Sequence, residues 1–193
     1  MKNKDGRKPK KDKRGRDHLR WTLRIFLLSV ALSAVLSLCS GAALDGAGLV
    51  TAIVILLFFV ALGIVFDVIG VAATAADPKP FHAMASHRVR GAKQAIALIK
   101  NADKVASFCN DVVGDICGIV SGSTAAVIVT QLRMGLSVNA LLLSTAVTAL
   151  ISGLTIGGKA LGKRFAIVRS KKVVFFVAKL MAALRIGGQG NRG

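Results

Sequence analysis

The sequence predicts an all-α integral membrane protein with four transmembrane helices and additional juxtamembrane amphipathic helices. Three observations lead to this fold class. The 193 residues have a mean hydropathy of +0.62 and are 53% hydrophobic, which is too apolar for a soluble domain of this size. The apolar residues form four runs, each long enough to cross a hydrocarbon core of ~30 Å as a helix. The lysines and arginines gather in alternate connections between these runs.

Each of the four apolar runs predicts one transmembrane helix, because a lipid-exposed backbone has to satisfy its own hydrogen bonds. The runs cover residues 21–38, 48–76, 105–131 and 139–158. The first helix, with bounds at 21–41, follows a basic start and so shares the general plan of a signal peptide. The stretch LSLCSGAA within it is a poor cleavage site. We therefore expect this helix to remain in the protein.

The basic residues predict the orientation. Of the 27 lysines and arginines, 26 lie up to residue 24, within 79–104, or from residue 159 onward, and only Arg133 lies in an opposite connection. Connections on the cytoplasmic side carry an excess of Lys and Arg. The sequence therefore predicts a multi-pass protein of the cell membrane, with both termini and the 77–104 connection in the cytoplasm.

The remaining segments are expected to be tails and surface helices. Residues 1–20 and 187–193 are predicted to be disordered. The basic tail carries no aromatic stacking residues, so we expect it to rest near anionic lipid and not to bind nucleic acid. Residues 81–100 and 164–186 mix apolar and basic positions with helical spacing. Both segments are therefore predicted to be amphipathic helices at the lipid surface.

Three carboxylates interrupt the apolar runs and identify the candidate site. The chain contains nine acidic residues, all Asp, and places Asp67, Asp111 and Asp115 within the second and third runs. A carboxylate costs about 2.5–3.5 kcal/mol at the centre of a membrane helix, so such residues face a bundle interior or a wet cavity and often mark an ion or proton pathway. Asp111 and Asp115 share one helix face, and their like charges require a cation, a proton or a basic partner.

The neighbouring residues favour Mg²⁺ as the cation. Mg²⁺ takes oxygen ligands, commonly one or two carboxylates with carbonyls and waters. Ser107, Asn110 and glycine-exposed carbonyls would add neutral oxygen, and Asp67 would complete an acidic pocket. Structural ion pairs and a proton relay remain as alternatives to a cation site. The basic candidates for such ion pairs are Lys159, Lys104 and Arg88.

Other reactive side chains do not form a recognisable site. Cys39, Cys109 and Cys117 are isolated thiols without metal-ligand spacing, and they are expected to behave as small apolar residues. His82 and His87 are expected at the surface. The sequence contains no nucleophile–base pair, phosphate loop or metalloprotease motif, so we do not expect an enzyme.

Three stretches of the chain occur in an order and at a spacing that point to a family. They are FDVIGVAATA from Phe66, RGAKQAIALIKNADKVASFCNDVVGD with its Asn-x-Asp-Lys sequence, and ISGLTIGGKALGKRFA. Together they resemble the first-span ending, the juxtamembrane helix with the second span, and the GEIxPKxLGKxxA ending of the CNNM/CorC magnesium transporter family. The resemblance covers about 55–185, with the membrane domain at 48–163.

The resemblance implies a homodimer with three spans per subunit and a dehydrated divalent cation in an inward-opening acidic cavity. The family's ligand positions, transferred to this sequence and combined with the oxygen donors named above, give a set of expected metal ligands. They are Asp67, Ser107, Asn110, Asp111, Gly114, Asp115 and Gly153. The sequence departs from the family pattern in three places, with Asp67 for a serine, Thr155 for an acidic residue and Gly158 for a proline.

The extra N-terminal helix also lies outside the pattern, and the regulatory nucleotide-binding CBS domains of the family are not found in this sequence. A separate regulatory subunit would be one further partner. The function predicted from the sequence is thus a Mg²⁺ transporter-like membrane protein. The alternative is a non-transporting membrane scaffold or partner subunit with structural ion pairs.

Overall fold

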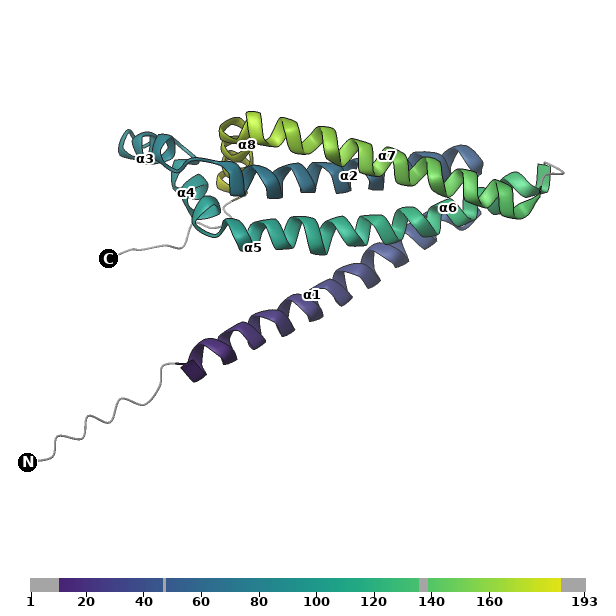
Figure 1. Ribbon diagram of the computed structural model, residues 1–193, viewed down its shortest axis with the longest axis horizontal. Coiled ribbons are helices and arrows are strands. Elements are labelled where there is room, and N and C mark those ends of the chain that lie inside the picture. The colour runs from purple at the N-terminus through teal and green to yellow at the C-terminus, as the bar shows by residue number, and fades with distance from the viewer. Residues whose placement is uncertain (1–10, 47, 136–138, 185–193) are drawn as a thin grey trace, which may run out of the picture.

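The computed structural model confirms the all-α fold class (Figure 1). It describes residues 11–46, 48–135 and 139–184, and this part of the chain contains no β-strand. Four helical segments are long and apolar enough to cross a membrane, in agreement with the four predicted spans. They are Trp21–Leu44, Leu49–Ala75, Ala102–Met134 and Ala140–Val168. By the length and composition of these helices, the chain is a membrane protein.

The helices follow one another through short connections. They are α1 (Lys11–Leu44), α2 (Leu49–Ala75), α3 (Lys79–Ser86), α4 (Ala92–Lys100), α5 (Ala102–Ser107), the π-helix η1 (Phe108–Gly114), α6 (Asp115–Gly135), α7 (Ala140–Val168) and α8 (Ser170–Ala183). The segments α5, η1 and α6 form one continuous helix, which corresponds to the third predicted span.

Several helix boundaries differ from the prediction. The surface helix predicted at 164–186 begins only at Ser170, as α8, because residues 164–168 still belong to α7. The helix α1 begins at Lys11, so residues 11–20 are helical where a disordered tail was expected. Lysine and arginine are good helix formers, and the helix of the first apolar run therefore extends backward into the basic segment without a break. The helix α7 extends to Val168, ten residues past the end of the fourth apolar run. Residues 1–10 and 187–193, the remainder of the expected tails, lie outside the described residues.

The predicted surface helix at 81–100 is divided into the two helices α3 and α4. The helix α3 ends at Ser86, and Arg88, two residues later, adopts a left-handed backbone with φ of 54°. The Arg88 N–H donates to the Ala85 carbonyl and the Val89 N–H donates to the Met84 carbonyl, each at 3.0 Å. This pattern is a Schellman motif, whose left-handed position is usually occupied by glycine.

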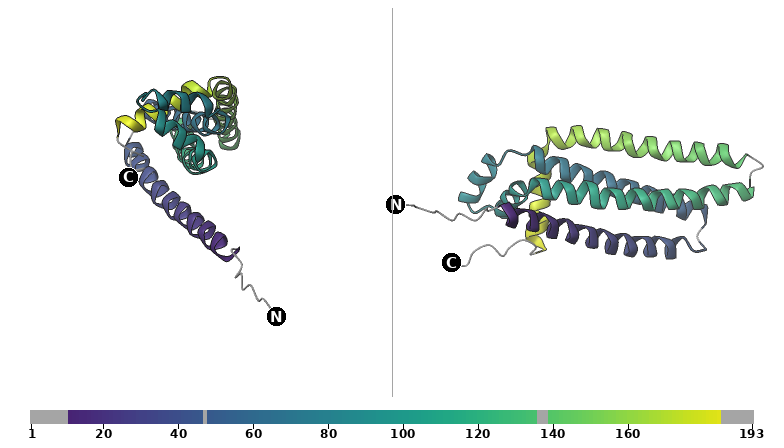
Figure 2. Two further views of the ribbon diagram at one scale, coloured as in Figure 1. Left: turned by 90° about the vertical axis from the view of Figure 1, so that its left-hand side faces the viewer. Right: turned by 60° about the horizontal axis from the view of Figure 1, so that its bottom comes forward.

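The helix α2 occupies the centre of the bundle. It contacts α5, η1 and α6 on one side and α7 on another. The helix α1 lies at the outside, against α6 and η1 (Figure 1). The helix α8 crosses one end of the bundle and packs against α4 and α2. The starts of α1 and α5 and the ends of α2 and α7 lie at this same end, together with α3 and α4 (Figure 2).

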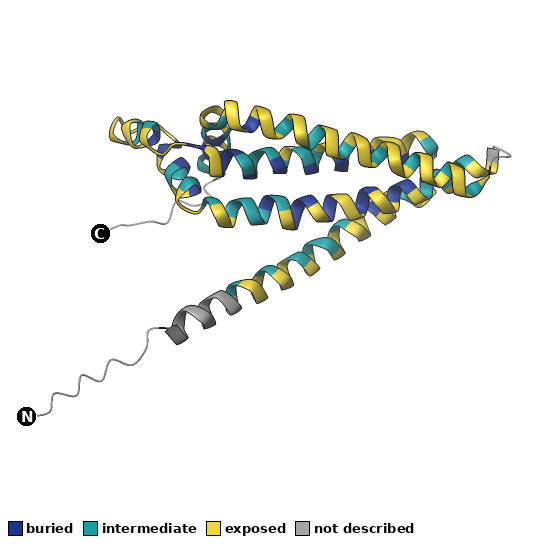
Figure 3. Cartoon of the chain, viewed as in Figure 1, coloured by how far each residue is buried: buried dark blue, intermediate teal, exposed yellow. Residues whose placement is uncertain are grey.

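Three buried apolar clusters include residues of α2. The first joins α2 to the surface helices around Phe81, the second joins it to η1 and α6 around Val120, and the third lies near Leu56. Burial is therefore concentrated on α2 and α6, whereas α1 and α7 expose most of their apolar side chains (Figure 3). Exposed leucines such as Leu38 and Leu150 on these two helices suit contact with lipid.

Two glycines allow α7 to approach α2 closely. A Cβ atom added at Gly158 would collide with the Ile64 side chain, and one added at Gly162 would lie 2.7 Å from the Val68 Cγ2 atom. By contrast, added Cβ atoms at Gly153 and Gly157 meet no other atom within 4 Å. Helix packing therefore accounts for two of the four glycines near the end of this span.

Candidate functional site

The carboxylate of Asp67 is buried inside the helix bundle. Among the side chains that the structure describes, it is the only charged one that is buried, with 4% of its surface exposed. Its Oδ2 atom has no hydrogen-bond partner. Asp67 lies eight residues before the end of α2, a rise of about 12 Å. A buried, unpartnered carboxylate oxygen is costly, so its presence requires an explanation.

Asn110 brings a second unpartnered oxygen to the same helix contact. Its Oδ1 atom is buried and accepts no hydrogen bond. The amide group packs against Gly70 of α2, where an added Cβ atom would lie 2.5 Å from Oδ1 and 3.3 Å from the Ala106 Cα atom. Gly70 is three residues from Asp67, which is about one helical turn. Two acceptor oxygens without partners therefore occur where α2 meets α5 and η1.

Asp111 and Asp115 lie on a different face of the third span. Both are exposed. The Ser107 hydroxyl donates a hydrogen bond to the Asp111 Oδ2 atom at 2.8 Å. Within the described part of the chain, neither carboxylate nor that of Asp67 forms an ion pair within 4.0 Å. The structure thus separates one buried carboxylate from two exposed ones.

Lys159 of α7 carries a positive charge into the interior of the bundle. Its Nζ atom lies 3.7 Å from the position of a Cβ atom added at Gly114, the last residue of η1. The preceding residue, Gly158, rests on Ile64, three residues before Asp67. The ammonium group is therefore held at nearly the same level of the bundle as the buried carboxylate. The sequence identified this lysine only as a possible ion-pair partner.

Other buried hydroxyl groups in α6 are satisfied by their own helix. Ser121 donates to the Cys117 carbonyl at 2.7 Å, and Thr124 donates to the Val120 carbonyl at 2.8 Å. Such bonds to the carbonyl four residues earlier are common for Ser and Thr in helices. The buried oxygens of Asp67 and Asn110, like the Ser40 hydroxyl of α1, have no such partner.

The seven predicted ligands do not all come together. Gly153 is exposed and its α-carbon faces open space. Among the described residues, no three His, Cys, Asp or Glu side chains are grouped closely enough to hold a metal ion. A cation bound in the interior would depend on Asp67 together with neutral oxygens, such as Asn110 and the carbonyls of η1. Ser107 and Asp111 form a separate polar group on the exposed face.

The π-helix η1 is the structural feature that the sequence did not reveal. It carries both Asn110 and Asp111 within seven residues. Helices with this wider turn are rare and often occur at functional sites. All residues of FCNDVVG have low helix propensity, with Gly114 the lowest, but low propensity does not predict a change of helix type. The sequence of this segment therefore contains no pattern that predicts a π-helix.

The structure agrees with the expectations for two of the cysteines and for both histidines. Cys109 and Cys117 are buried, and Cys117 belongs to the apolar cluster around Val120, whereas Cys39 is exposed. His82 and His87 are exposed on α3 and at its end.

The fold and the buried aspartate define a helical membrane protein with an unpaired carboxylate in its interior. No protein-family model, curated protein or solved structure matches this chain. The resemblance to the CNNM/CorC family therefore depends on the three sequence stretches alone.

Proposed function

We propose that this protein is a multi-pass carrier-like protein that binds and moves a divalent cation, preferably Mg²⁺, across the cell membrane. The observation that carries the proposal is the buried Asp67, which has an unpartnered oxygen and no ion pair among the described residues. The Asn110 oxygen at the adjacent turn has no partner either. A hard cation with oxygen ligands would satisfy both atoms, and the resemblance to CNNM/CorC transporters suggests the same cargo.

The proposed orientation places both termini and the 77–104 connection in the cytoplasm. The helices α3, α4 and α8 and the end of α7, which carry most of the basic residues that follow α1, lie at one end of the bundle, whereas the end of α6, which carries Arg133, lies at the other (Figure 2). This asymmetry fits the positive-inside rule. Asp67 would then lie about 12 Å from the cytoplasmic end of α2, within reach of an inward-facing opening.

We further propose that the protein forms a homodimer through the exposed face of α6. Asp111, Asp115, Gly118 and Gly122 are exposed along this face, and added Cβ atoms at both glycines meet open space. Two carboxylates cannot rest against lipid without a large cost, and glycines allow helices to approach closely. A second copy would cover the glycines and leave the carboxylates in a polar space between the subunits.

Gly122→Leu is expected to shift this dimer toward monomer, because the leucine side chain would hold the two α6 helices apart. The measurement is the protein mass from light scattering of the full chain in detergent, corrected for the micelle. Gly157→Leu provides a matched control, since Gly157 is also exposed in a span and meets open space. A wild-type protein that is monomeric throughout, or a variant as dimeric as the wild type, would contradict the proposed interface.

A second candidate function is a non-transporting scaffold or partner subunit, with or without a separate regulatory subunit. The observation in its favour is Lys159, whose ammonium group lies at the level of Asp67 and carries a fixed positive charge into the bundle. Such a tethered cation could offset the buried carboxylate without any bound ion. The two functions differ in whether the wild-type protein moves a cation at all and whether this movement depends on the carboxylates.

The test of the proposed function is Mg²⁺ uptake by proteoliposomes that contain the full chain and a trapped fluorescent indicator. We expect the uptake rate to fall by about 10–100-fold in each of three variants, Asp67→Asn, Asp111→Ala and Asp115→Ala. Mutation of residues that only support the ligands of a metal site lowers activity by a similar factor. Asp103→Asn is the matched control, because Asp103 is an exposed carboxylate in the first turn of α5. No uptake by the wild type would favour the scaffold, and equal uptake by all variants would show that none of these carboxylates belongs to a cation site.

A further inference from the structure

We propose that the turn between α3 and α4 binds the phosphate group of an anionic phospholipid. This inference is independent of the proposed cation transport, since it concerns the surface helices at the end of the bundle. A hollow of about 560 Å³ lies beside this turn. The residues that line it are Ala85, Arg88, Val89, Arg90, Gly91, Lys93, Gln94 and Ala182.

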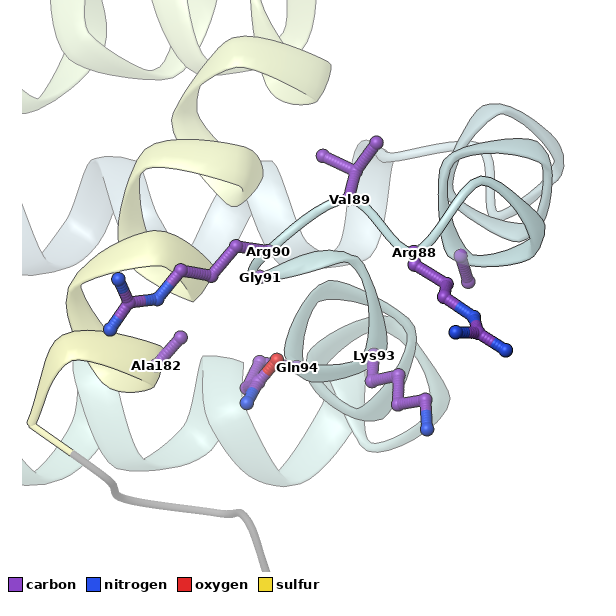
Figure 4. Close-up of a pocket in the computed structure, with 8 residues that line it drawn as sticks. Arg88, Val89, Arg90, Gly91, Lys93, Gln94 and Ala182 are labelled. Carbon is purple, nitrogen blue, oxygen red and sulfur yellow. The ribbon is translucent and has the colours of Figure 1, made fainter.

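The hollow is rimmed by three cationic side chains that are free to bind a ligand. In Figure 4, Arg90 extends toward α8, where Ala182 lies, while Arg88 and Lys93 extend on the other side of the start of α4. All three are exposed, and none makes a hydrogen bond or ion pair with another described residue. Guanidinium and ammonium groups are the usual partners of phosphate oxygens.

The charge of this surface is not compensated by nearby acidic residues. The sequence contains no Asp or Glu between Asp77 and Asp103, and none after Asp115. The surface helices α3, α4 and α8 therefore present only basic and neutral side chains. An uncompensated cluster of this kind repels itself unless an anion lies beside it.

The backbone at Arg88 adds an argument that is independent of charge. This residue occupies the left-handed position of the Schellman motif at the end of α3, with φ of 54°. Glycine fits this position without strain, whereas a residue with a Cβ atom is held there at a cost. An arginine in a position suited to glycine is expected where its guanidinium group has a role, and the hollow beside it provides one.

The turn between α3 and α4 packs against α8, so the hollow lies beside a helix that contacts lipid. A Cβ atom added at Gly91, which has φ of 94°, would lie 3.3 Å from the Lys179 Cα atom. Val174 and Ala178 bury one face of α8, while its outward face exposes Phe176 and Leu180. Exposed apolar side chains flanked by lysines are typical of a helix that lies in the membrane interface. A phosphate bound beside this helix would therefore belong to a lipid headgroup.

The test counts the lipids that remain on the full chain, purified in detergent, by native mass spectrometry after addition of phosphatidylglycerol or phosphatidylcholine. Wild-type protein is expected to retain phosphatidylglycerol in preference to phosphatidylcholine, whose choline cation competes with the arginines. The variant Arg88→Gln/Lys93→Gln is expected to retain about fivefold less phosphatidylglycerol for each cation removed. The variant Lys171→Gln/Lys172→Gln, which loses two exposed lysines of α8 outside the hollow, is expected to behave as the wild type.

Several results would overturn the proposal. An equal loss in both double variants would show diffuse attraction by surface charge, and equal retention of the two lipids would exclude selection of an anionic headgroup. Displacement of phosphatidylglycerol by millimolar inorganic phosphate would assign the hollow to a soluble anion. The single variant Arg88→Gly removes one cation and relieves the left-handed backbone, so it should fold at least as well as the wild type. Unchanged lipid retention by this variant would also contradict the site.

Discussion

Replacement of Asp67 by leucine is expected to stabilise the protein and at the same time abolish cation uptake. Leucine matches the branching of aspartate, and the position is 4% exposed. The substitution removes a buried carboxylate whose Oδ2 atom has no partner, which costs about 1–3 kcal/mol. The free energy of unfolding should therefore rise by about this amount. Transport should stop, because among the side chains that the structure describes no other charged one is buried.

The stability measurement is unfolding of the full chain in mixed detergent micelles, and the activity measurement is Mg²⁺ uptake. Asp67→Asn serves as the control, because it removes the charge but keeps the shape and a polar oxygen. It should lose uptake without a comparable gain in stability. A leucine variant that is less stable than the wild type would show that the carboxylate makes a stabilising interaction, and the scaffold function would then be preferred.

Replacement of Gly70 by leucine is expected to have the second large effect. A Cβ atom at this position would lie 2.5 Å from the Asn110 Oδ1 atom and 3.3 Å from the Ala106 Cα atom. The second contact is with backbone, which cannot move aside by a change of rotamer. Overpacking of this kind costs about 1–3 kcal/mol and occasionally more. It should also separate Asn110 from the turn that carries Asp67, and thereby lower uptake.

Gly157→Leu is the matched control for this substitution, because Gly157 lies in α7 and an added Cβ atom there meets open space. The control should keep the wild-type stability to within about 0.5 kcal/mol, as surface substitutions usually do. If Gly70→Leu unfolds at the same point as the control, the contact between α2 and η1 is not as close as the structure indicates.

The four spans and the fold class could be predicted because they depend on local composition. A run of about 20 apolar residues predicts a membrane helix wherever the rest of the chain lies. The start of α1 at Lys11 could not be predicted in this way, since basic residues extend a helix without an apolar signal. The division of 81–100 also escaped prediction, because Arg88 stands where glycine would have marked the turn.

The candidate site could be predicted only in part. The residues themselves could be identified, because a carboxylate or an amide is rare within a long apolar run. Their arrangement could not be identified, since Asp67 and Asn110 are 43 positions apart in the sequence, and only the pairing of α2 with η1 brings Asn110 against Gly70, one turn from Asp67. Asp111 and Asp115, which form an i, i+4 pair in the sequence, are exposed and lie apart from the buried contact.

The sequence by itself determined that this protein is helical and membrane-type, how many of its helices are long and apolar enough to cross a membrane, and which polar residues interrupt them. These properties follow from hydropathy and charge, which each residue carries regardless of its neighbours in space. The tertiary structure decided which carboxylate is buried, that Asn110 lies against Gly70, and that Lys159 reaches Gly114. Those contacts depend on helix register and on the π-helix η1, and both are set by close packing between distant segments.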